Sequence, residues 1–385
     1  MPIAIYLLSL CSFAFGLSEF VAAGLLSGMA RELHASVAAT GGAIAAYALG
    51  AAIGAPILTA LLACRSDRLV LAATMLALAV GSVGMAAAPG LTSLLLLRFL
   101  VGLAHGVFMA VASNAATRLV EPSRSGRALA VVWLGLTLAL ACGVPLGTWL
   151  GALWSWRAVF ASIAVLALAG GMGLLWAMPK TPRPAQTLSA LASLRALLQP
   201  ALLLAAGIAA LVSVATFSFF TYISPFLLQV SGLDANWLGA AMLSAAMLSF
   251  GACAIGGNLL GGRLADGLHA RGWTLLALAA LALNLLGFYI LRTQALAMLA
   301  LCGSLGLLFF AIVTLSTMRL LRLARQLDPG VAAVAAGLNI ASFNLGTAAG
   351  GLLGGALIAG WGLPFVSLGG MAAALLAMLL LLRTS

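Results

Sequence analysis

Apolar residues occur along this chain in long blocks, and short connections between the blocks carry most of the charged residues. A helix needs about 20 apolar residues to cross a membrane, and with its connection each crossing uses roughly 30 residues. The blocks lack the period-two alternation of a membrane barrel, and in lipid the remaining solution is the helix. The pattern therefore predicts an all-α integral membrane protein with twelve transmembrane helices, near residues 4–29, 37–62, 69–89, 91–117, 127–152, 157–178, 200–229, 236–262, 273–291, 295–318, 331–359 and 362–382.

The composition supports a membrane protein. Hydrophobic residues make up 64% of the 385 positions and charged residues 6%, whereas about 25% of the residues of a soluble domain are charged. The first apolar block has no basic segment before it and is too long for the apolar region of a signal peptide. We therefore expect it to remain on the protein as the first helix.

The basic residues are distributed unevenly between the two sides of the predicted membrane. If the chain starts in the cytoplasm, three of the 18 lysines and arginines (Arg31, Arg157 and Arg292) lie outside and Arg98 lies within the membrane. The other 14 lie on the cytoplasmic side: Arg65, Arg68, Arg118, Arg124, Arg127, Lys180, Arg183, Arg195, Arg263, Arg271, Arg319, Arg322, Arg325 and Arg383. This positive-inside distribution predicts cytoplasmic termini. It accounts for the net charge of +11 without a nucleic-acid partner.

The chain divides into two halves of six predicted helices each. The least hydrophobic long segment, 179–199, separates an N-terminal bundle (1–178) from a C-terminal bundle (200–385) and is predicted to be a cytoplasmic linker. Residues Gly143, Leu146, Gly147 and Trp154 recur 207 positions later as Gly350, Leu353, Gly354 and Trp361. Such internal repeats are typical of transporters whose halves rock about a site near the middle of the membrane.

Glu19 is the one carboxylate deep within a predicted membrane helix. A charge at that depth costs roughly 2.5–3.5 kcal/mol even on insertion scales, so it indicates a function or a partner. At about 1.5 Å per residue, Glu19 lies roughly 20 Å into the first helix and Arg98 roughly 10 Å from the other face in the fourth. In a membrane core about 30 Å thick the two lie at one level. They can form a pair or share a proton-linked network.

Two other interpretations of these residues stay open. Glu19 and Arg98 can form a static ion pair, or Arg98 can donate only to backbone carbonyls. His105 lies two turns further along the fourth helix. It can relay protons near neutral pH or be a neutral hydrogen-bonding residue.

Several motifs carry a resemblance to a known family. Residues 262–267 read Gly-Arg-Leu-Ala-Asp-Gly, 98–102 read Arg-Phe-Leu-Val-Gly, and 143–148 read Gly-Val-Pro-Leu-Gly-Thr. Segments 16–26, 46–56 and 337–346 extend the match over essentially the whole chain. Together they resemble the major facilitator superfamily, in its drug/proton antiporter branch and the arabinose-efflux-permease-like group. Glycines at 102 and 106 form a face that allows close packing of another helix.

The resemblance implies the fold, the location and a class of function. It implies two pseudo-symmetric six-helix bundles in a bacterial inner membrane, exporting sugars, nucleosides or drugs such as chloramphenicol. It also implies that the antiporter motif, Gly135, Gly143, Pro145 and Gly147, shapes a bent helix between the halves.

The resemblance further implies a charge network that latches the halves on the cytoplasmic side. In the N-terminal copy of that loop Thr59 and Ala63 replace the family's Gly and Asp, so a latch there is weakened or moves to Asp67. The alternative is a solvated loop without a latch. The candidate latch residues are Arg65, Asp67, Arg68, Gly262, Arg263, Asp266 and Arg271.

Candidate solute-binding residues are the polar and aromatic residues of the helices that line the cavity in this fold. In the N-terminal half they are Phe13, Phe15 and Asn114, beside Glu19; in the C-terminal half they are Phe217, Phe220, Tyr222, Gln229, Asn339, Phe343 and Asn344. The C-terminal helices carry no central acid. A mostly apolar cavity with amide groups suits a neutral or lipophilic solute.

The leading hypothesis is proton-coupled alternating access that exports a small drug-like molecule or metabolite, with Glu19 as the coupling carboxylate beside Arg98 and His105. One alternative is a sugar or nucleoside exporter or uniporter in which Glu19 binds the solute; another is a passive channel or membrane sensor. The chain has one lysine, Lys180, and no nucleotide-binding or catalytic motif, so we expect no enzyme. We expect no cofactor or metal either, and partners limited to solute, protons and lipid, with a monomer sufficient.

Overall fold

The computed structural model of the protein describes residues 1–62, 65–121, 124–180, 199–231, 237–265, 269–327 and 331–383. Within these ranges every regular element is helical, and twelve helices are long and apolar enough to cross a membrane. The predicted all-α architecture with twelve membrane helices is confirmed. Most predicted boundaries agree with the observed ones to within a few residues.

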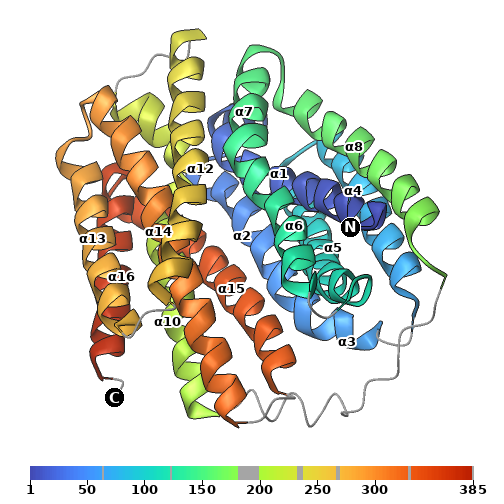
Figure 1. Cartoon of the computed structure of the whole chain (residues 1–385). Coiled ribbons are helices and arrows are strands. Elements are labelled where there is room, and N and C mark those ends of the chain that lie inside the picture. The colour runs from blue at the N-terminus through green and yellow to red at the C-terminus, as the bar shows by residue number, and fades with distance from the viewer. Residues whose placement is uncertain are drawn as a thin grey trace.

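The helices form two groups that follow the order of the chain, blue to green and yellow to red in Figure 1. The first group comprises α1 (Ile3–Glu32), α2 (Val37–Ile53), η1 (Gly54–Leu58), α3 (Thr59–Leu61), α4 (Asp67–Ala86), α5 (Leu91–Arg118), α6 (Ser125–Leu138), η3 (Ala139–Gly143), α7 (Val144–Leu153) and α8 (Trp156–Ala177). The second comprises α10 (Pro200–Phe220), α11 (Ile223–Pro225), η4 (Phe226–Val230), α12 (Trp237–Ala265), α13 (Ala270–Ile290), α14 (Ala295–Leu327), α15 (Val331–Gly360), η5 (Leu363–Phe365) and α16 (Val366–Arg383).

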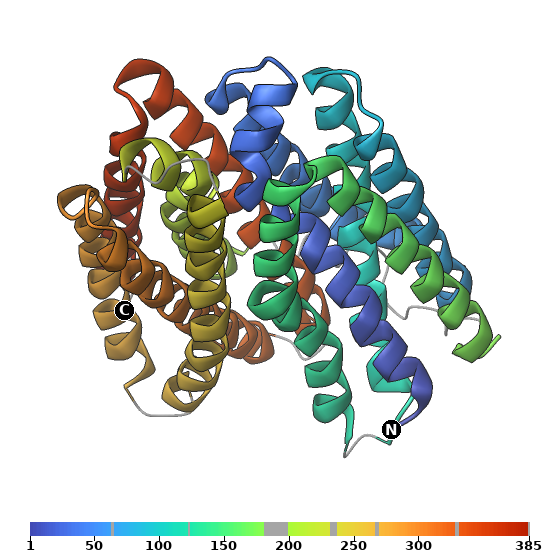
Figure 2. The same ribbon diagram turned by 90° about the horizontal axis from the view of Figure 1, so that it is seen from above.

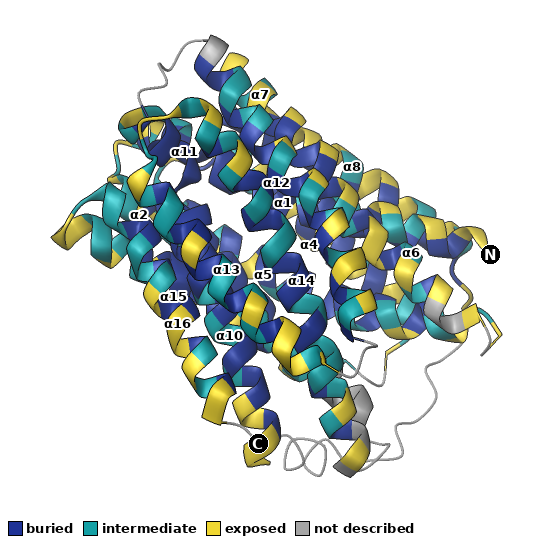
Figure 3. Ribbon diagram, turned by 60° about the vertical axis from the view of Figure 1, so that its left-hand side comes forward, coloured by how far each residue is buried: buried dark blue, intermediate teal, exposed yellow. Residues whose placement is uncertain are grey.

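We propose that these groups are the two bundles predicted at 1–178 and 200–385. Most of the predicted linker, residues 181–198, lies outside the described residues. An even number of crossings places both chain ends on one side of the membrane, which we call the terminal side; the other is the opposite side. Buried residues face between neighbouring helices and exposed apolar residues cover the outer surface (Figure 3).

The seventh membrane helix differs from the continuous segment predicted at 200–229. α10 ends at Phe220, a turn follows at Thr221 and Tyr222, and the chain continues as α11 and the π-helical η4. Proline has no N–H to donate and is tolerated in the first turn of a helix. Pro225 lies in the three-residue helix α11, so the interruption comes just before it.

Glycines bring membrane helices into backbone contact at equivalent places in the two halves. A methyl group at Gly50, Gly54, Gly102 or Gly106 would overlap backbone atoms of the facing helix in the α2–α5 pair. Gly257 and Gly261 on α12, 207 positions after Gly50 and Gly54, meet the backbone of α14 in the same way. The close packing predicted for Gly102 and Gly106 is confirmed, and the repeat extends to this contact.

The two halves meet closely on the opposite side. α2 packs against α15, visible near the centre of Figure 2 as blue beside red, and α7 packs against α12. Ser224 on α11 donates to Ser27 on α1, with 3.0 Å between the hydroxyl oxygens. The Tyr222 hydroxyl donates to Gly351 O at 2.8 Å and lies 3.4 Å from Ala38 O of the first half. The structure is therefore closed on the opposite side.

The glycine contacts predict that added volume between α2 and α5 destabilises the protein. Gly102→Ala should lower the free energy of unfolding by about 3 kcal/mol, because the helices must separate to admit the methyl group. The midpoint of thermal unfolding, followed by tryptophan fluorescence in detergent, measures the effect.

Gly207 on α10 is the matched control, since a methyl group there meets nothing within 4 Å. Gly207→Ala should stabilise the protein by about 0.5–1 kcal/mol, because alanine loses less backbone entropy on folding. Equal midpoints for the two variants would contradict the backbone contact.

Candidate functional site

Arg98 is fully buried in α5 and its side chain reaches across to two neighbouring helices. Its Nη1 donates to Ser18 O at 2.5 Å, its Nη2 to Glu19 O at 3.2 Å, and its Nε to Ala43 O at 3.1 Å. The guanidinium also lies over the Tyr47 ring, 4.2 Å from the ring centroid. Arg98 therefore ties α5 to α1 and α2 through carbonyl oxygens.

The predicted pair of Glu19 and Arg98 is not formed as a side-chain salt bridge in the described part of the chain. The two residues do lie at one level, as counting along the helices predicted, but the arginine contacts the backbone oxygen of Glu19. The interpretation that Arg98 donates to backbone carbonyls matches the structure. The Glu19 carboxyl is left without a guanidinium partner.

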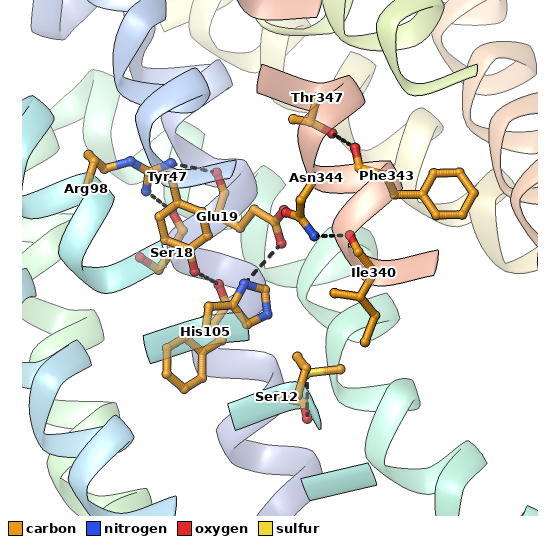
Figure 4. A network of polar contacts seen from close by, with 12 residues as sticks. Ser12, Ser18, Glu19, Tyr47, Arg98, His105, Ile340, Phe343, Asn344 and Thr347 are labelled. Carbon is orange, nitrogen blue, oxygen red and sulfur yellow. Dashed lines mark hydrogen bonds and ion pairs between the residues drawn. The ribbon is translucent and has the colours of Figure 1, made fainter. Parts of the chain in front are cut away.

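The Glu19 carboxyl approaches His105 instead. Its Oε2 lies 3.6 Å from Nδ1 of His105, and the two side chains are 12% and 7% exposed. The imidazole is held in place by rings, because it stacks on Phe15 at 5.0 Å and lies 5.6 Å from Tyr47. Figure 4 shows the carboxyl and the imidazole pointing toward each other.

The other side of the Glu19 carboxyl faces a small cavity between the two halves. Its volume is about 10 Å³, which is room for one water molecule. It is lined by Glu19, Phe20, Ala23, Ile44, Tyr47 and Ala48 of the first half and by Phe217, Phe220 and Thr347 of the second. In this closed arrangement the site can hold water but not a solute.

The α15 wall of this region carries an amide. Asn344 Nδ2 donates to Ile340 O at 2.9 Å, and its Oδ1 is buried with no hydrogen-bond partner among the described residues. In Figure 4 the amide points toward the Glu19 carboxyl.

The fifth membrane helix packs against α1 through the antiporter motif. Gly135 meets the backbone of Ser9, Gly143 the ring of Phe13, and Gly147 the side chain of Val21. The π-helical η3 directly precedes Pro145, which has no N–H to donate, and both features are places where helices commonly bend. The η3 backbone at Leu140 and Ala141 touches Gly251 on α12. The fifth membrane helix thus contacts the other half.

The comparisons with known proteins identify the family. Residues 8–339 match the family model described as Major Facilitator Superfamily. The chain belongs to this superfamily. The chain is similar to the inner membrane transport protein YdhP of Escherichia coli K12, with 34% identity over 383 residues, which cover 98% of this chain and 95% of YdhP. The chain is therefore a multi-pass membrane transporter, and not an enzyme.

Two further comparisons add to the membership. A chloramphenicol resistance protein of Streptomyces lividans is 38% identical over 245 residues, 62% of each chain. The matched part thus spans under two thirds of that relative. A solved bacterial homologue of the human lysosomal transporter Spinster, in an inward-facing and occupied conformation, superposes with a TM-score of 0.74 at 15% identity, covering 99% of this chain and 95% of the other. The fold of the superfamily is confirmed.

The predicted solute residues are only partly brought together in this superfamily member. Phe217 and Phe220 line the cavity, and Phe343 packs against Phe309 of α14 at 6.4 Å. Asn339 donates to Thr317 at 2.9 Å and so joins α15 to α14. Asn344 points toward Glu19 (Figure 4).

The other five predicted solute residues do not line the central cavity. Phe15 is fully buried behind His105, and Phe13 packs against the antiporter motif. Asn114 and Gln229 are exposed and lie outside the central cavity. The fully buried Tyr222 fills a glycine-lined space at the contact of the two halves.

Two of the latch candidates, Asp67 and Arg271, contact residues of their own halves. Asp67 forms an ion pair with Arg118, which joins the start of α4 to the end of α5. Arg271 donates to Leu381 O at 3.3 Å and Leu382 O at 3.0 Å. Arg65 and Arg263 are exposed and Arg68 is partly buried, while Asp266 lies outside the described residues.

The latch candidate Gly262 makes no close contact with another helix, whereas the neighbouring Gly261 does. Gly262 has no atom within 4 Å of an added methyl group, whereas Gly261 meets the backbone of Ala311. The close approach on this side of α12 is therefore made by Gly261. Gly261 lies on the face of α12 that packs against α14, and Gly262, the next residue, lies on a different face.

Three residues of the site were not predicted from the sequence. Tyr47 contacts Arg98 and donates to Phe15 O at 3.3 Å, and Phe20 and Thr347 line the cavity. All three look like ordinary residues of apolar helices. Their positions relative to Glu19, at i+1 for Phe20 and on other helices for Tyr47 and Thr347, gain meaning only from the tertiary packing.

The contacts of Arg98 predict that lysine cannot replace it. Arg98→Lys should destabilise the protein by about 1–3 kcal/mol for each carbonyl left unpaired, because a single ammonium cannot reach three acceptors on two helices. The thermal unfolding midpoint of the purified variant measures this. The matched control is Arg292→Lys, since Arg292 also lies over a tyrosine ring, 4.8 Å from the Tyr289 centroid, but is only half-buried. Equal losses in the two variants would show that the carbonyls are not the cause.

Proposed function

We propose that the protein exports a small drug-like molecule or metabolite in exchange for protons, by alternating access of one central site. The observation that carries this proposal is the Glu19 carboxyl, which lies between His105 and a cavity shared by the two halves. An acid at this depth is typical of proton pathways in transporters.

The surroundings of Glu19 suit a group that changes its protonation state. Arg98 is held by three carbonyls, so no side-chain ion pair with it fixes Glu19 as a carboxylate. The cavity walls are mainly aromatic and aliphatic, which favours the neutral acid, while nearby Arg98 favours the anion. Small changes in packing between two conformations can therefore decide which form of Glu19 is stable.

The contacts between the halves support alternating access. The halves touch through Ser27 and Ser224 and around Tyr222 on the opposite side. With the terminal side in the cytoplasm, as the positive-inside distribution predicts, the structure represents the form closed to the outside. The central cavity is too small for a solute here, so solute entry belongs to a conformation in which the halves separate.

The relatives support export. One curated relative is a chloramphenicol resistance protein and another is an inner membrane transport protein. The aromatic lining around Phe20, Phe217 and Phe220 suits a lipophilic solute. We propose the bacterial inner membrane as the location, and a monomer as the working unit.

A second candidate follows from the same cavity. Glu19 faces the cavity directly, so it can bind the solute itself in a sugar or nucleoside exporter or uniporter. A passive channel or sensor lacks comparable support, because the central cavity is almost closed.

Glu19→Gln separates proton coupling from solute binding. Chloramphenicol is the first probe and is tested in proteoliposomes under two conditions. We expect counterflow without a proton gradient to persist, while uptake driven by a gradient of one pH unit, which can support about tenfold accumulation per proton, falls to equilibration.

Glu32→Gln is the control on the same helix. Glu32 accepts from Trp156 Nε1 and pairs with Arg157 on the opposite side, both at 2.5 Å, so its loss should leave proton-driven accumulation intact. Loss of counterflow together with accumulation in Glu19→Gln would favour direct solute binding. Unchanged transport in that variant would rule out both roles of Glu19.

A further inference from the structure

Glu19 on α1 and Thr347 on α15 line the same cavity, and Asn344 lies one turn before Thr347 on the same face of α15. The Asn344 amide nitrogen is engaged by Ile340 O, 2.9 Å away on its own helix. This bond orients the amide and turns its oxygen away from Ile340. In Figure 4 the amide points toward the Glu19 carboxyl.

The orientation leaves an acceptor that needs a donor. Asn344 Oδ1 is buried and has no hydrogen-bond partner among the described residues. A carboxylate has acceptors only, whereas a protonated carboxyl has one O–H to donate. Glu19 can therefore satisfy Asn344 in its protonated form and not in its ionised form.

We propose that Asn344 reads the protonation state of Glu19 across the interface between the two halves. The protonated carboxyl donates its O–H to the Asn344 oxygen and holds α15 close to α1. Loss of the proton places two acceptors against each other, and α15 separates from α1. The inference rests on the proposed proton coupling and names the residue that converts protonation into movement of the other half.

The charged or titratable side chains that the structure describes around Glu19 all come from its own half of the protein. Arg98 and His105 face it from α5, and Tyr47 faces it from α2. From the second half, the cavity receives Phe217, Phe220 and Thr347, none of which titrates. Thr347 donates to Phe343 O at 2.9 Å on its own helix. Asn344 is therefore the group of the second half that is placed to respond to the proton.

The test measures the distance between the halves as a function of pH. Spin labels replace Trp154 and Trp361, which are 76% and 72% exposed at the opposite-side ends of α7 and α15, in a background lacking the five native cysteines. In the otherwise wild-type protein we expect the short distance to become more populated as the pH falls.

Asn344→Leu should shift the pH midpoint of this change downward by about one unit, since a tenfold loss is typical for one hydrogen bond of this kind. Asn344→Ala is the second variant, in case leucine prevents folding. The matched control is Asn339→Leu on the same helix, whose amide is bonded to Thr317; its midpoint should match the wild type.

Glu19→Gln supplies a permanent N–H donor and should keep the short-distance population at its low-pH level at every pH, without removing the open form that counterflow requires. Adding Asn344→Leu to it should reduce the short-distance population, and adding Asn339→Leu should not. An Asn344→Leu midpoint equal to that of the wild type, with Glu19→Gln still insensitive to pH, would overturn this inference alone. If Glu19→Gln responds to pH as the wild type does, the proposed coupling through Glu19 fails as well.

Discussion

The first half is organised around a buried guanidinium that, among the described residues, forms no salt bridge with a carboxylate. Arg98 satisfies its charge with three backbone carbonyls on α1 and α2, and only the planar fork of arginine can reach such a set at once. The glycines at 50 and 102 let α2 and α5 approach closely enough for this geometry. Because the carbonyls hold Arg98, the Glu19 carboxyl at the same level stays available to His105 and to the cavity.

The second half repeats the packing without the charge. Gly257 and Gly261 on α12 meet the backbone of α14 as Gly50 and Gly54 meet that of α5. The C-terminal wall of the cavity consists of rings and a hydroxyl, Phe217, Phe220 and Thr347. A pseudo-symmetric fold thus carries an asymmetric site: one half holds the titratable groups and the other supplies neutral surfaces that pack against them.

The sequence predicted the residues of the site better than their contacts. Counting along helices placed Glu19 and Arg98 at one level, because the rise of a helix is fixed. It did not show that Arg98 faces carbonyls, or that Phe15 stacks on His105 behind the carboxyl. Those contacts depend on how each helix is rotated about its axis, and a uniformly apolar helix carries little periodicity that would reveal its rotation. The position of Tyr222 could not be predicted either. It lies in the helix interruption just before Pro225, where its hydroxyl contacts the other half.

The amino-acid sequence by itself determined the twelve membrane helices, the repeat of its halves and the one acidic group in their midst. The membrane helices are a local property of the sequence. In lipid each crossing segment must pair its own backbone N–H and C=O groups, so each one is visible as a long apolar stretch. The tertiary structure alone decided the partners: His105 beside Glu19, carbonyls around Arg98, and Gly261 in place of Gly262. Which side chains contact each other depends on the rotation and separation of two packed helices. Neither quantity can be predicted from the hydropathy of either helix.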